Sequence, residues 1–255
     1  MNIYDVAKQC GVSIATVSRV LNENPNVNAQ TRARVLEVIR ELGYTPNVFA
    51  RGLGLNSMKM IGIMCTDVSD PYYAKAVSLT EQLLRARGFG TLLCCTGHAH
   101  GGKRQALALL LEKRVDGILL IGSPFSESHC DHIRAAAAQV PVVIINGWLD
   151  LPNVYSLLCD ERGAMARNTA QLAAQGAQHI CYLYDALTFS GTEKLAGYRA
   201  SVSAAGLPDC SCRVAPGMQA ARAQVETMLR SGTPIDAVLT AEDILAVGAC
   251  KALTA

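Results

Sequence analysis

The sequence lacks the features of a membrane protein or a secreted protein. No apolar stretch reaches the roughly 18 residues that a membrane-spanning helix needs. Near the start of the chain, Asn2, Tyr4, Asp5 and Lys8 interrupt any apolar core that a signal peptide would have. We therefore expect a soluble chain that stays in the cytoplasm and contacts no membrane.

Motifs for metal binding and catalysis are missing as well. The ten cysteines include no Cys-x-x-Cys pair, and the His and Cys residues between 98 and 132 lack firm zinc-ligand spacing. Several cysteines fall in apolar, strand-like runs, where a reduced cysteine acts as a small buried hydrophobe. The sequence contains no glycine loop with phosphate-binding spacing, no nucleophile elbow and no recognisable triad. We expect no metal, no cofactor and no enzymatic activity.

The chain has little excess of either charge, but its basic and acidic residues are unevenly distributed. The 255 residues carry a formal net charge of +2, which by itself indicates no particular partner. Residues 1–60 hold 7 Lys and Arg against 4 Asp and Glu, whereas the rest hold 16 against 17. A basic excess at one end of the chain is where a nucleic-acid-binding surface would be expected. The bias is small, so without a motif an ordinary solvated surface would explain it.

The first 46 residues predict three short helices and no strand. The spacing of apolar residues places them over Ile3–Cys10, from Ser13 to about Leu21, and from Asn28 or Ala29 to Gly43. Only Gly11-Val12-Ser13 separates the first two helices. A three-residue turn with glycine between two short helices is typical of a helix-turn-helix, because glycine adopts the turn conformation at little cost.

From Met60 onward, apolar strand-like runs alternate with amphipathic helical stretches. This alternation is typical of α/β domains whose parallel sheets are covered on both faces. In such sheets, ligands bind beyond the carboxyl ends of the strands. The expected strands are Ile61–Cys65, Thr91–Cys95, Gly117–Ile121, Val142–Ile145, Tyr155–Leu158, Ile180–Leu183, Arg213–Ala215 and Ala237–Thr240. The expected helices are Tyr72–Arg87, Lys103–Lys113, Glu127–Gln139, Glu161–Ala174, Leu195–Ala205, Gln219–Leu229 and Ile244–Leu253.

Several segments together form a specific set of motifs. In the N-terminal part they are Ile3-Tyr4-Asp5-Val6-Ala7, Gly11-Val12-Ser13, Ala15-Thr16-Val17-Ser18-Arg19-Val20-Leu21-Asn22, Asn24-Pro25-Asn26-Val27 and Ala50-Arg51-Gly52-Leu53. This set resembles the headpiece of the lac repressor family, and within it most of all the catabolite control proteins. Weaker matches to the family follow at Asp67–Ala74, Val115–Leu119, Leu195–Tyr198 and Asp243–Ala249, so the resemblance covers the whole chain.

The resemblance implies a fold class and domain boundaries. It implies an all-α helix-turn-helix headpiece over residues 1–46, a hinge over 47–59, and an α/β core like that of periplasmic sugar-binding proteins. Two parallel-sheet lobes form this core, an N-terminal lobe over 60–160 and a C-terminal lobe over 161–255. Family members continue for several more elements after the point where this chain ends, so we expect a C-terminally truncated, incomplete second lobe.

The resemblance also implies which headpiece residues contact DNA. Ile14, Ala15 and Arg19 are expected to contact base edges in the major groove. The guanidinium of Arg19 can hold guanine O6 and N7 with two hydrogen bonds, whereas Ile14 and Ala15 offer only apolar contacts. Headpiece packing for Ile14 and a phosphate contact for Arg19 are the alternatives. The expected contacts to the DNA backbone are Thr16, Ser18, Asn22 and Arg32.

In the hinge, Ala50 and Leu53 are implied to enter the minor groove, with Leu53 wedged between the central base pairs. Gly52 and Gly54 flank Leu53, and each lowers helix propensity by about 1 kcal/mol relative to alanine. We therefore expect the hinge to fold only when DNA and a second subunit supply contacts. The alternative is a flexible linker with an incidental leucine. A two-fold dimer would read a pseudo-palindrome, with a flexible C-G step at its centre.

Six polar residues of the core are implied to bind a small effector, and each could instead be an ordinary surface group: Asp70, Tyr73, Asn146, Asp160, Lys194 and Glu242. Lys194 stands where the family usually has arginine, and Glu242 stands where it usually has asparagine. Because lysine is a point charge and not a planar fork, the ligand can differ from the common family effectors. The mixed donors and acceptors of these residues suit a sugar or a sugar phosphate.

These features predict a sequence-specific DNA-binding transcriptional regulator, most simply a repressor. It is expected to bind a palindromic operator in double-stranded DNA as a homodimer and to respond to a small carbohydrate effector. Two alternatives stay open. The core could dock a phosphorylated carrier protein, as some catabolite control proteins do, or the chain could be a solute-binding protein of a transporter. The headpiece and the missing signal peptide argue against the transporter alternative.

Overall fold

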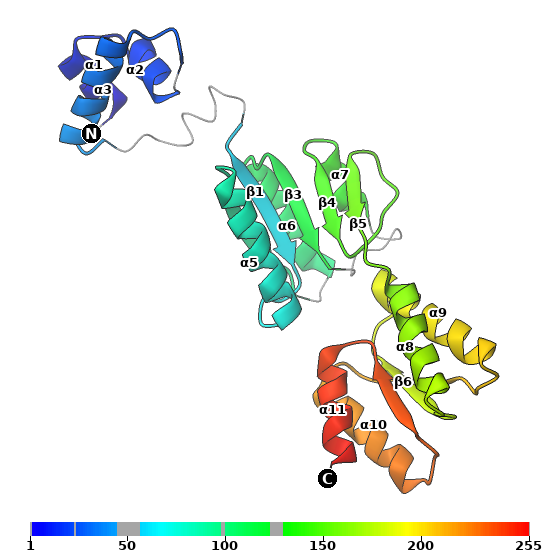
Figure 1. Ribbon diagram of the computed structural model, residues 1–255. Coiled ribbons are helices and arrows are strands. Elements are labelled where there is room, and N and C mark those ends of the chain that lie inside the picture. Colours follow the sequence, from blue (N-terminus) through cyan, green and yellow to red (C-terminus); the bar gives the residue numbers. More distant parts are fainter. Residues whose placement is uncertain (1, 23, 45–56, 98–99, 123–129, 255) are drawn as a thin grey trace.

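The structure is a computed structural model, and it describes the chain except for residues 1, 23, 45–56, 98–99, 123–129 and 255. Short helices come first along the chain, and strands alternate with helices after them (Figure 1). The predicted fold class, a helical headpiece followed by an α/β core with parallel sheets, is confirmed.

The headpiece consists of helices α1 (Ile3–Cys10), α2 (Ile14–Leu21) and α3 (Ala29–Glu41). Each helix begins after a polar residue whose side chain accepts hydrogen bonds from backbone N–H groups of the first turn, as Asn2, Ser13 and Asn28 do. Gly11 ends α1 with a φ of 62°, a left-handed conformation that favours glycine. The headpiece core is made of small apolar side chains: Val6, Ala7, Cys10, Val17, Val20, Val35 and Val38.

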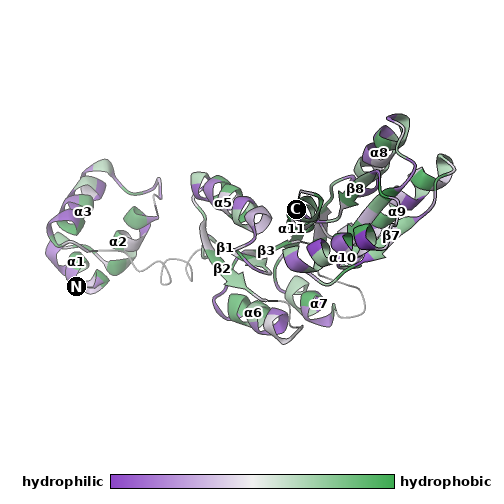
Figure 2. Cartoon of the chain, turned by 90° about the horizontal axis from the view of Figure 1, so that it is seen from below, coloured by the Kyte–Doolittle hydropathy of each residue, from purple (hydrophilic) through white to green (hydrophobic). Residues whose placement is uncertain are grey.

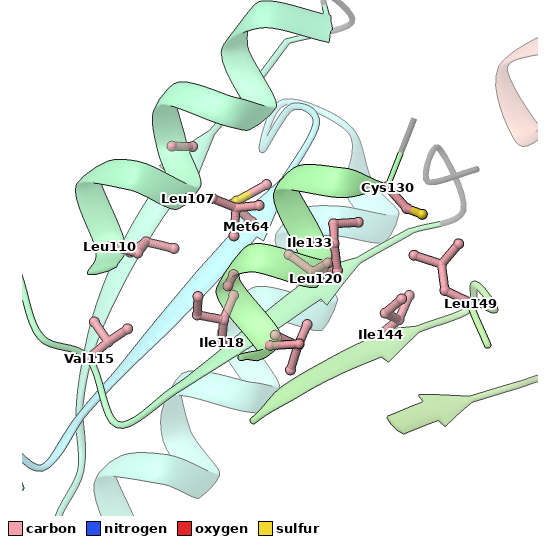
Figure 3. Close-up of a cluster of buried hydrophobic side chains, with 14 residues drawn as sticks. Met64, Leu107, Leu110, Val115, Ile118, Leu120, Cys130, Ile133, Ile144 and Leu149 are labelled. Atoms are coloured by element: carbon pink, nitrogen blue, oxygen red, sulfur yellow. The ribbon is translucent and has the colours of Figure 1, made fainter. Parts of the chain in front are cut away.

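A five-stranded parallel sheet in the order β2-β1-β3-β4-β5 forms the N-terminal lobe. Its strands are β1 (Met60–Cys65), β2 (Gly90–Cys95), β3 (Gly117–Ile121), β4 (Val142–Ile145) and β5 (Val154–Leu157). Helix α5 (Pro71–Ala86) covers one face, and α6 (His100–Glu112) and α7 (Asp131–Ala137) cover the other (Figure 2). Side chains of each strand alternate between the faces. Ile63 therefore packs toward α5, whereas Met64 and Leu120 pack toward α6 and α7 (Figure 3).

The C-terminal lobe contains a three-stranded parallel sheet in the order β7-β6-β8. Its strands are β6 (Ile180–Tyr184), β7 (Cys210–Arg213) and β8 (Ala237–Thr240). Helices α8 (Glu161–Ala174) and α9 (Phe189–Ala204) pack on one face, and α10 (Met218–Arg230) and α11 (Asp243–Leu253) pack on the other. The buried Tyr198 hydroxyl donates to the Ile180 carbonyl oxygen at 2.8 Å and accepts from the Cys210 N–H at 2.9 Å. It thereby links β6 to the start of β7.

The two lobes fix the start of their first strand in the same way. Asp116, just before β3, accepts hydrogen bonds from the N–H groups of Met58 and Met60 at 3.1 and 2.8 Å. Asp236, just before β8, accepts from Gln178 and His179, both at 2.8 Å, and these bonds lower the pKa of Asp236. Each carboxylate satisfies backbone donors at a strand end that would otherwise need another partner.

Two predicted boundaries in the C-terminal lobe are wrong. Helix α9 begins at Phe189, well before the predicted Leu195. The Gly191 N–H donates to Thr188 Oγ1 at 3.2 Å, and a Cβ on Gly191 would lie 2.2 Å from the Ala186 carbonyl oxygen. A cap and a close backbone approach therefore set this helix start, and neither depends on apolar spacing. Strand β7 spans Cys210–Arg213 instead of 213–215, because its register is set by pairing with β6.

Candidate functional site

Helix α2 has a buried side and an exposed side. Val17 and Val20 are buried in the headpiece core, whereas Ile14, Ala15 and Arg19 are exposed. Ile14 keeps 38% of its surface accessible, so it is not a core residue of the headpiece. All three residues with predicted base contacts are therefore accessible to a molecule that approaches the exposed side of this helix.

Of the residues with predicted contacts to the DNA backbone, Thr16 and Ser18 lie in α2, Asn22 is its C-cap, and Arg32 lies in α3. Thr16 Oγ1 lies 3.0 Å from Ser13 Oγ, which also accepts the Thr16 N–H at 3.2 Å. Ser18 and Asn22 are half-buried, and the Asn22 N–H donates to the Ser18 carbonyl oxygen at 3.0 Å. The N-terminal turn of a helix favours anions because its N–H groups point outward. The polar groups near Ser13 are thus at the end of α2 that suits a phosphate.

Arg32 has a structural role that its sequence position did not predict. Its Nη2 atom donates to the Asn24 carbonyl oxygen at 2.5 Å in a half-buried hydrogen bond. This bond joins α3 to the loop that follows α2, so it helps to hold α2 on the headpiece. A guanidinium carries five N–H donors, and because Arg32 has no other side-chain hydrogen bond to the described residues, its other donors can still contact a phosphate.

We expect Arg32→Ala to destabilise the headpiece by roughly 1.5–3 kcal/mol, the range for a hydrogen bond to a charged group. Hydrogen exchange of the α2 and α3 backbone amides in the intact chain measures this local stability. Arg40→Ala, at an exposed position of the same helix, is the matched control. If Arg32→Ala leaves the hydrogen exchange of these amides unchanged but weakens binding to all DNA sequences equally, Arg32 contacts phosphate and does not stabilise the headpiece.

Part of the predicted machinery lies outside the described residues. Ala50 and Leu53, with predicted minor-groove contacts, fall in the segment 45–56. The first residues of the predicted helix Glu127–Gln139 also fall outside, and α7 accounts for Asp131–Ala137. The roles of the hinge residues stay predictions.

Polar side chains from both lobes gather beyond the carboxyl ends of the strands. Asp70 and Tyr73 follow β1, and Asn146 follows β4; in the other lobe, Lys194 follows β6 and Glu242 follows β8. The charge of Glu242 acts on Tyr73 across the two lobes. With Glu161, the first residue of α8, they form what we call the interlobe cluster: Asp70, Tyr73, Asn146, Glu161, Lys194 and Glu242. This is where doubly wound sheets place their ligands.

Tyr73 is positioned by a close contact with a glycine. A Cβ on Gly122, where φ is 105°, would lie 2.7 Å from Tyr73 Oη, so glycine leaves the room that the phenol ring occupies. Asp70 caps α5 by accepting the Tyr72 N–H at 2.8 Å. Burial raises the pKa of Tyr73, and the negative charges of Asp70 and Glu242 raise it further. Tyr73 therefore keeps its hydroxyl proton at neutral pH.

Glu161 is the centre of the cluster, and sequence reasoning missed it. Its Oε1 atom accepts hydrogen bonds from Asn146 Nδ2 at 3.1 Å and from Ser190 Oγ at 3.0 Å. Its Oε2 atom lies 3.8 Å from Lys194 Nζ, which donates to the Ala241 carbonyl oxygen at 2.9 Å. Glu161 thus joins a loop of the N-terminal lobe to α9 of the C-terminal lobe.

Glu242 is accessible to solvent, yet protein surrounds its carboxyl group on enough sides to desolvate it. This desolvation raises the pKa of Glu242; the positive charge of Lys194 lowers it, and the negative charges of Asp185 and Asp70 raise it. The position of Glu242 supports the sequence-based expectation that residue 242 faces a ligand.

Asp160 is the one predicted effector residue that the structure does not join to the cluster. Its Oδ1 atom accepts the Gly163 N–H at 2.8 Å, and its Oδ2 atom lies 3.4 Å from Arg167 Nη1. Both partners belong to α8, and the Asp160 side chain is 70% exposed. A Cβ on Gly163 would lie 2.1 Å from the Asp160 carboxylate. Asp160 therefore acts as the N-cap of α8, and its neighbour Glu161 reaches the cluster instead.

Two family models match the chain and together cover most of it. The bacterial regulatory proteins of the lacI family match residues 2–47, and the periplasmic binding proteins and sugar binding domain of the LacI family match residues 58–255. Within the part of the chain that the structure describes, none of the helices is both long enough and apolar enough to cross a membrane.

Curated relatives and a solved structure match along almost the whole chain. An HTH-type transcriptional regulator of Lachnoclostridium phytofermentans is 48% identical, over 98% of this chain and 77% of the relative. Catabolite control protein A of Priestia megaterium is 29% identical, over 97% of this chain and 76% of the relative. The crystal structure of the lac repressor dimer bound to operator and the anti-inducer ONPF covers 100% of this chain and 77% of that one, with a TM-score of 0.88 and 25% identity. The chain belongs to the lacI family of bacterial transcriptional regulators.

Proposed function

We propose that this regulator acts as a homodimeric repressor that places α2 in the major groove of an operator in the cytoplasm. One observation carries the proposal: Ile14, Ala15 and Arg19 are exposed on α2, while Val17 and Val20 hold the helix on the headpiece core. Two headpieces related by a two-fold axis read two half-sites of opposite orientation. The operator is therefore a pseudo-palindrome, and catalysis has no part in this function.

Selection from random double-stranded DNA tests this proposal. We expect an enriched pseudo-palindrome with a C-G step at its centre, because pyrimidine–purine steps bend most easily. Enrichment of an asymmetric site would contradict two-fold binding. Enrichment of no site at all would contradict sequence-specific recognition by α2.

Leu53→Ala tests the hinge separately from the headpiece. If Leu53 wedges between central base pairs, its removal abolishes operator bending and weakens specific binding, while non-specific binding changes little. Bending is measured by fluorescence energy transfer between the ends of a short operator duplex. Asn56→Ala, in the same segment, is a control that carries no wedge. Equal bending by Leu53→Ala and the unmodified chain would refute the role of Leu53.

We further infer that the interlobe cluster binds a small polyhydroxylated effector. Asn146 offers donors and an acceptor, the carboxylates offer acceptors, and Lys194 and Tyr73 offer donors. Sugar hydroxyl groups both donate and accept hydrogen bonds, so they complement this set. An apolar ligand would leave these groups without partners, at about 1–3 kcal/mol each. The description of the matching family model, which includes a sugar binding domain, agrees with this inference.

A thermal-shift screen of the purified chain separates an effector from a protein partner. A ligand that binds only the folded state raises the melting temperature in proportion to the logarithm of its concentration. We expect carbohydrates to raise it and nucleobases to leave it unchanged. If no small molecule shifts the temperature but a phosphorylated carrier protein does, the core is a protein-docking module instead.

A further inference from the structure

The interlobe cluster holds more negative charge than positive charge. Asp70, Glu161 and Glu242 carry carboxyl groups, Asp185 adds its charge nearby, and Lys194 is the cation among them. The ammonium group of Lys194 is already shared between the Glu161 carboxylate and the Ala241 carbonyl oxygen. Within the described residues, the Glu242 carboxyl group forms neither a hydrogen bond nor an ion pair with a side chain. The charge of Lys194 lowers the pKa of Glu242, but its ammonium group makes its contacts with Glu161 and Ala241, and the carboxyl groups of the cluster outnumber it.

A buried hydroxyl group points to an occupant at the same place. Tyr182 is fully buried, and its Oη atom finds no hydrogen-bond partner among the described residues. Burial raises the pKa of Tyr182, and the negative charges of Glu242, Glu161 and Asp185 raise it further, so these carboxylates are near enough to act on the phenol. Native proteins leave few buried polar atoms unpaired, so an unpaired hydroxyl group near these carboxylates makes this part of the cluster a candidate for ligand contact.

Asn146 adds a second unpaired atom on the opposite lobe. Its backbone has a φ of 59°, a left-handed conformation that asparagine tolerates, and its Nδ2 atom is held by Glu161. The Oδ1 atom is buried and has no hydrogen-bond partner among the described residues. This oxygen accepts hydrogen bonds and does not donate. The unpaired groups of the cluster therefore consist mostly of acceptors and negative charges.

We propose that the effector of this site is a polyhydroxylated amine, of the amino-sugar class, whose ammonium group binds near Glu242 and Asp70 while its hydroxyl groups bind on the side of the cluster where Asn146 and Tyr182 lie. The proposal rests on the effector-binding role proposed above and narrows the class of effector to positively charged sugars. An ammonium group supplies several N–H donors and a further positive charge at once. A phosphate or carboxylate ligand would add negative charge next to three carboxyl groups, which opposes binding.

The test is isothermal titration of the purified chain with matched sugars at neutral pH. The probes are glucosamine, galactosamine and mannosamine, each with its parent hexose and the hexose 6-phosphate. We expect at least one amine to bind about tenfold or more tightly than its parent hexose, and no phosphate to bind more tightly than its hexose. Equal or tighter binding of a hexose or a phosphate overturns the proposal but leaves carbohydrate binding in place.

Two variants and one control connect the charge preference to named residues. Glu242→Gln keeps the shape of the side chain and removes its charge, so the preference for amine over hexose should fall by about tenfold while hexose binding persists. Tyr182→Phe should weaken the binding of the amine and the binding of its parent hexose by a similar factor. Asp243→Asn removes an exposed neighbouring carboxylate at the start of α11 and should change the preference less than twofold.

Operator binding, measured in parallel, separates failure of this proposal from failure of the regulator function. If none of the nine sugars binds while the chain still binds its operator, both the amine and the carbohydrate effector are rejected, and the DNA-binding function stands. If Glu242→Gln and Asp243→Asn change the preference equally, the selectivity comes from overall charge and not from Glu242, which also overturns the proposal.

Discussion

Replacing Arg19 with alanine is expected to weaken operator binding by roughly 1–3 kcal/mol in each half-site and to relax the preference at one base pair there. Arg19 is exposed on α2, one helical turn beyond Ala15. Its guanidinium can contact guanine O6 and N7 together, and alanine can contact neither atom. Titrations on the selected operator, and on versions with each base pair changed, measure both effects. The salt concentration must be held constant, because phosphate contacts depend on it steeply.

Arg19→Lys is the matched variant for this experiment. Lysine keeps the positive charge but lacks the planar pair of donors, so the salt dependence should stay the same while the base preference is still weakened. The contrary result is an equal loss on operator and on random DNA for Arg19→Ala. That result would make Arg19 a phosphate contact and would shift base recognition to other residues of α2.

Most of the headpiece could be predicted from sequence because its signals are local. A polar residue precedes each helix and caps it, glycine ends α1, and the apolar spacing of Val17 and Val20 identifies the buried side of α2. Arg32 shows the limit of this approach. Its hydrogen bond to the Asn24 carbonyl oxygen depends on how a loop returns toward α3, and no pattern in the sequence encodes that approach.

The sheets of the core were predictable for a related reason. Strands such as β1 and β3 are buried on both faces and therefore read as continuous apolar runs. Strand β7 consists of Cys-Ser-Cys-Arg and lies at the edge of its sheet. An edge strand packs fewer apolar side chains, so its position follows from pairing with β6 and could not be read from composition.

One predicted effector residue, Asp160, lies directly before the acidic residue that joins the interlobe cluster. Asp160 was expected to face the ligand, but its carboxylate caps α8 and pairs with Arg167. Glu161 instead reaches Asn146, Ser190 and Lys194. Which of two adjacent acidic residues turns inward at a helix start depends on the cap geometry. The prediction named Asp160 and missed Glu161, because no local pattern in the sequence shows which of the two side chains turns inward.

Packing between α8 and α9 explains how Glu161 and Lys194 come close together. Gly197 lies one turn after Lys194, and a Cβ at residue 197 would lie 2.2 Å from the Arg162 carbonyl oxygen. Arg162 directly follows Glu161 in α8. The missing side chain therefore lets the two helix backbones approach each other beside the pair in which Lys194 Nζ lies 3.8 Å from Glu161 Oε2.

Gly197→Val is therefore expected to destabilise the C-terminal lobe by roughly 1–3 kcal/mol or more, the usual cost of overpacking, because backbone atoms and not a flexible side chain oppose the new methyl groups. Urea unfolding followed by circular dichroism measures the loss. Ala200→Val, on an exposed position of α9, carries the same β-branched cost in a helix without the clash. Equal stability of the two variants would show that α8 and α9 can separate at little cost. The Lys194–Glu161 pair would then be held by its own charges instead of by the contact at Gly197.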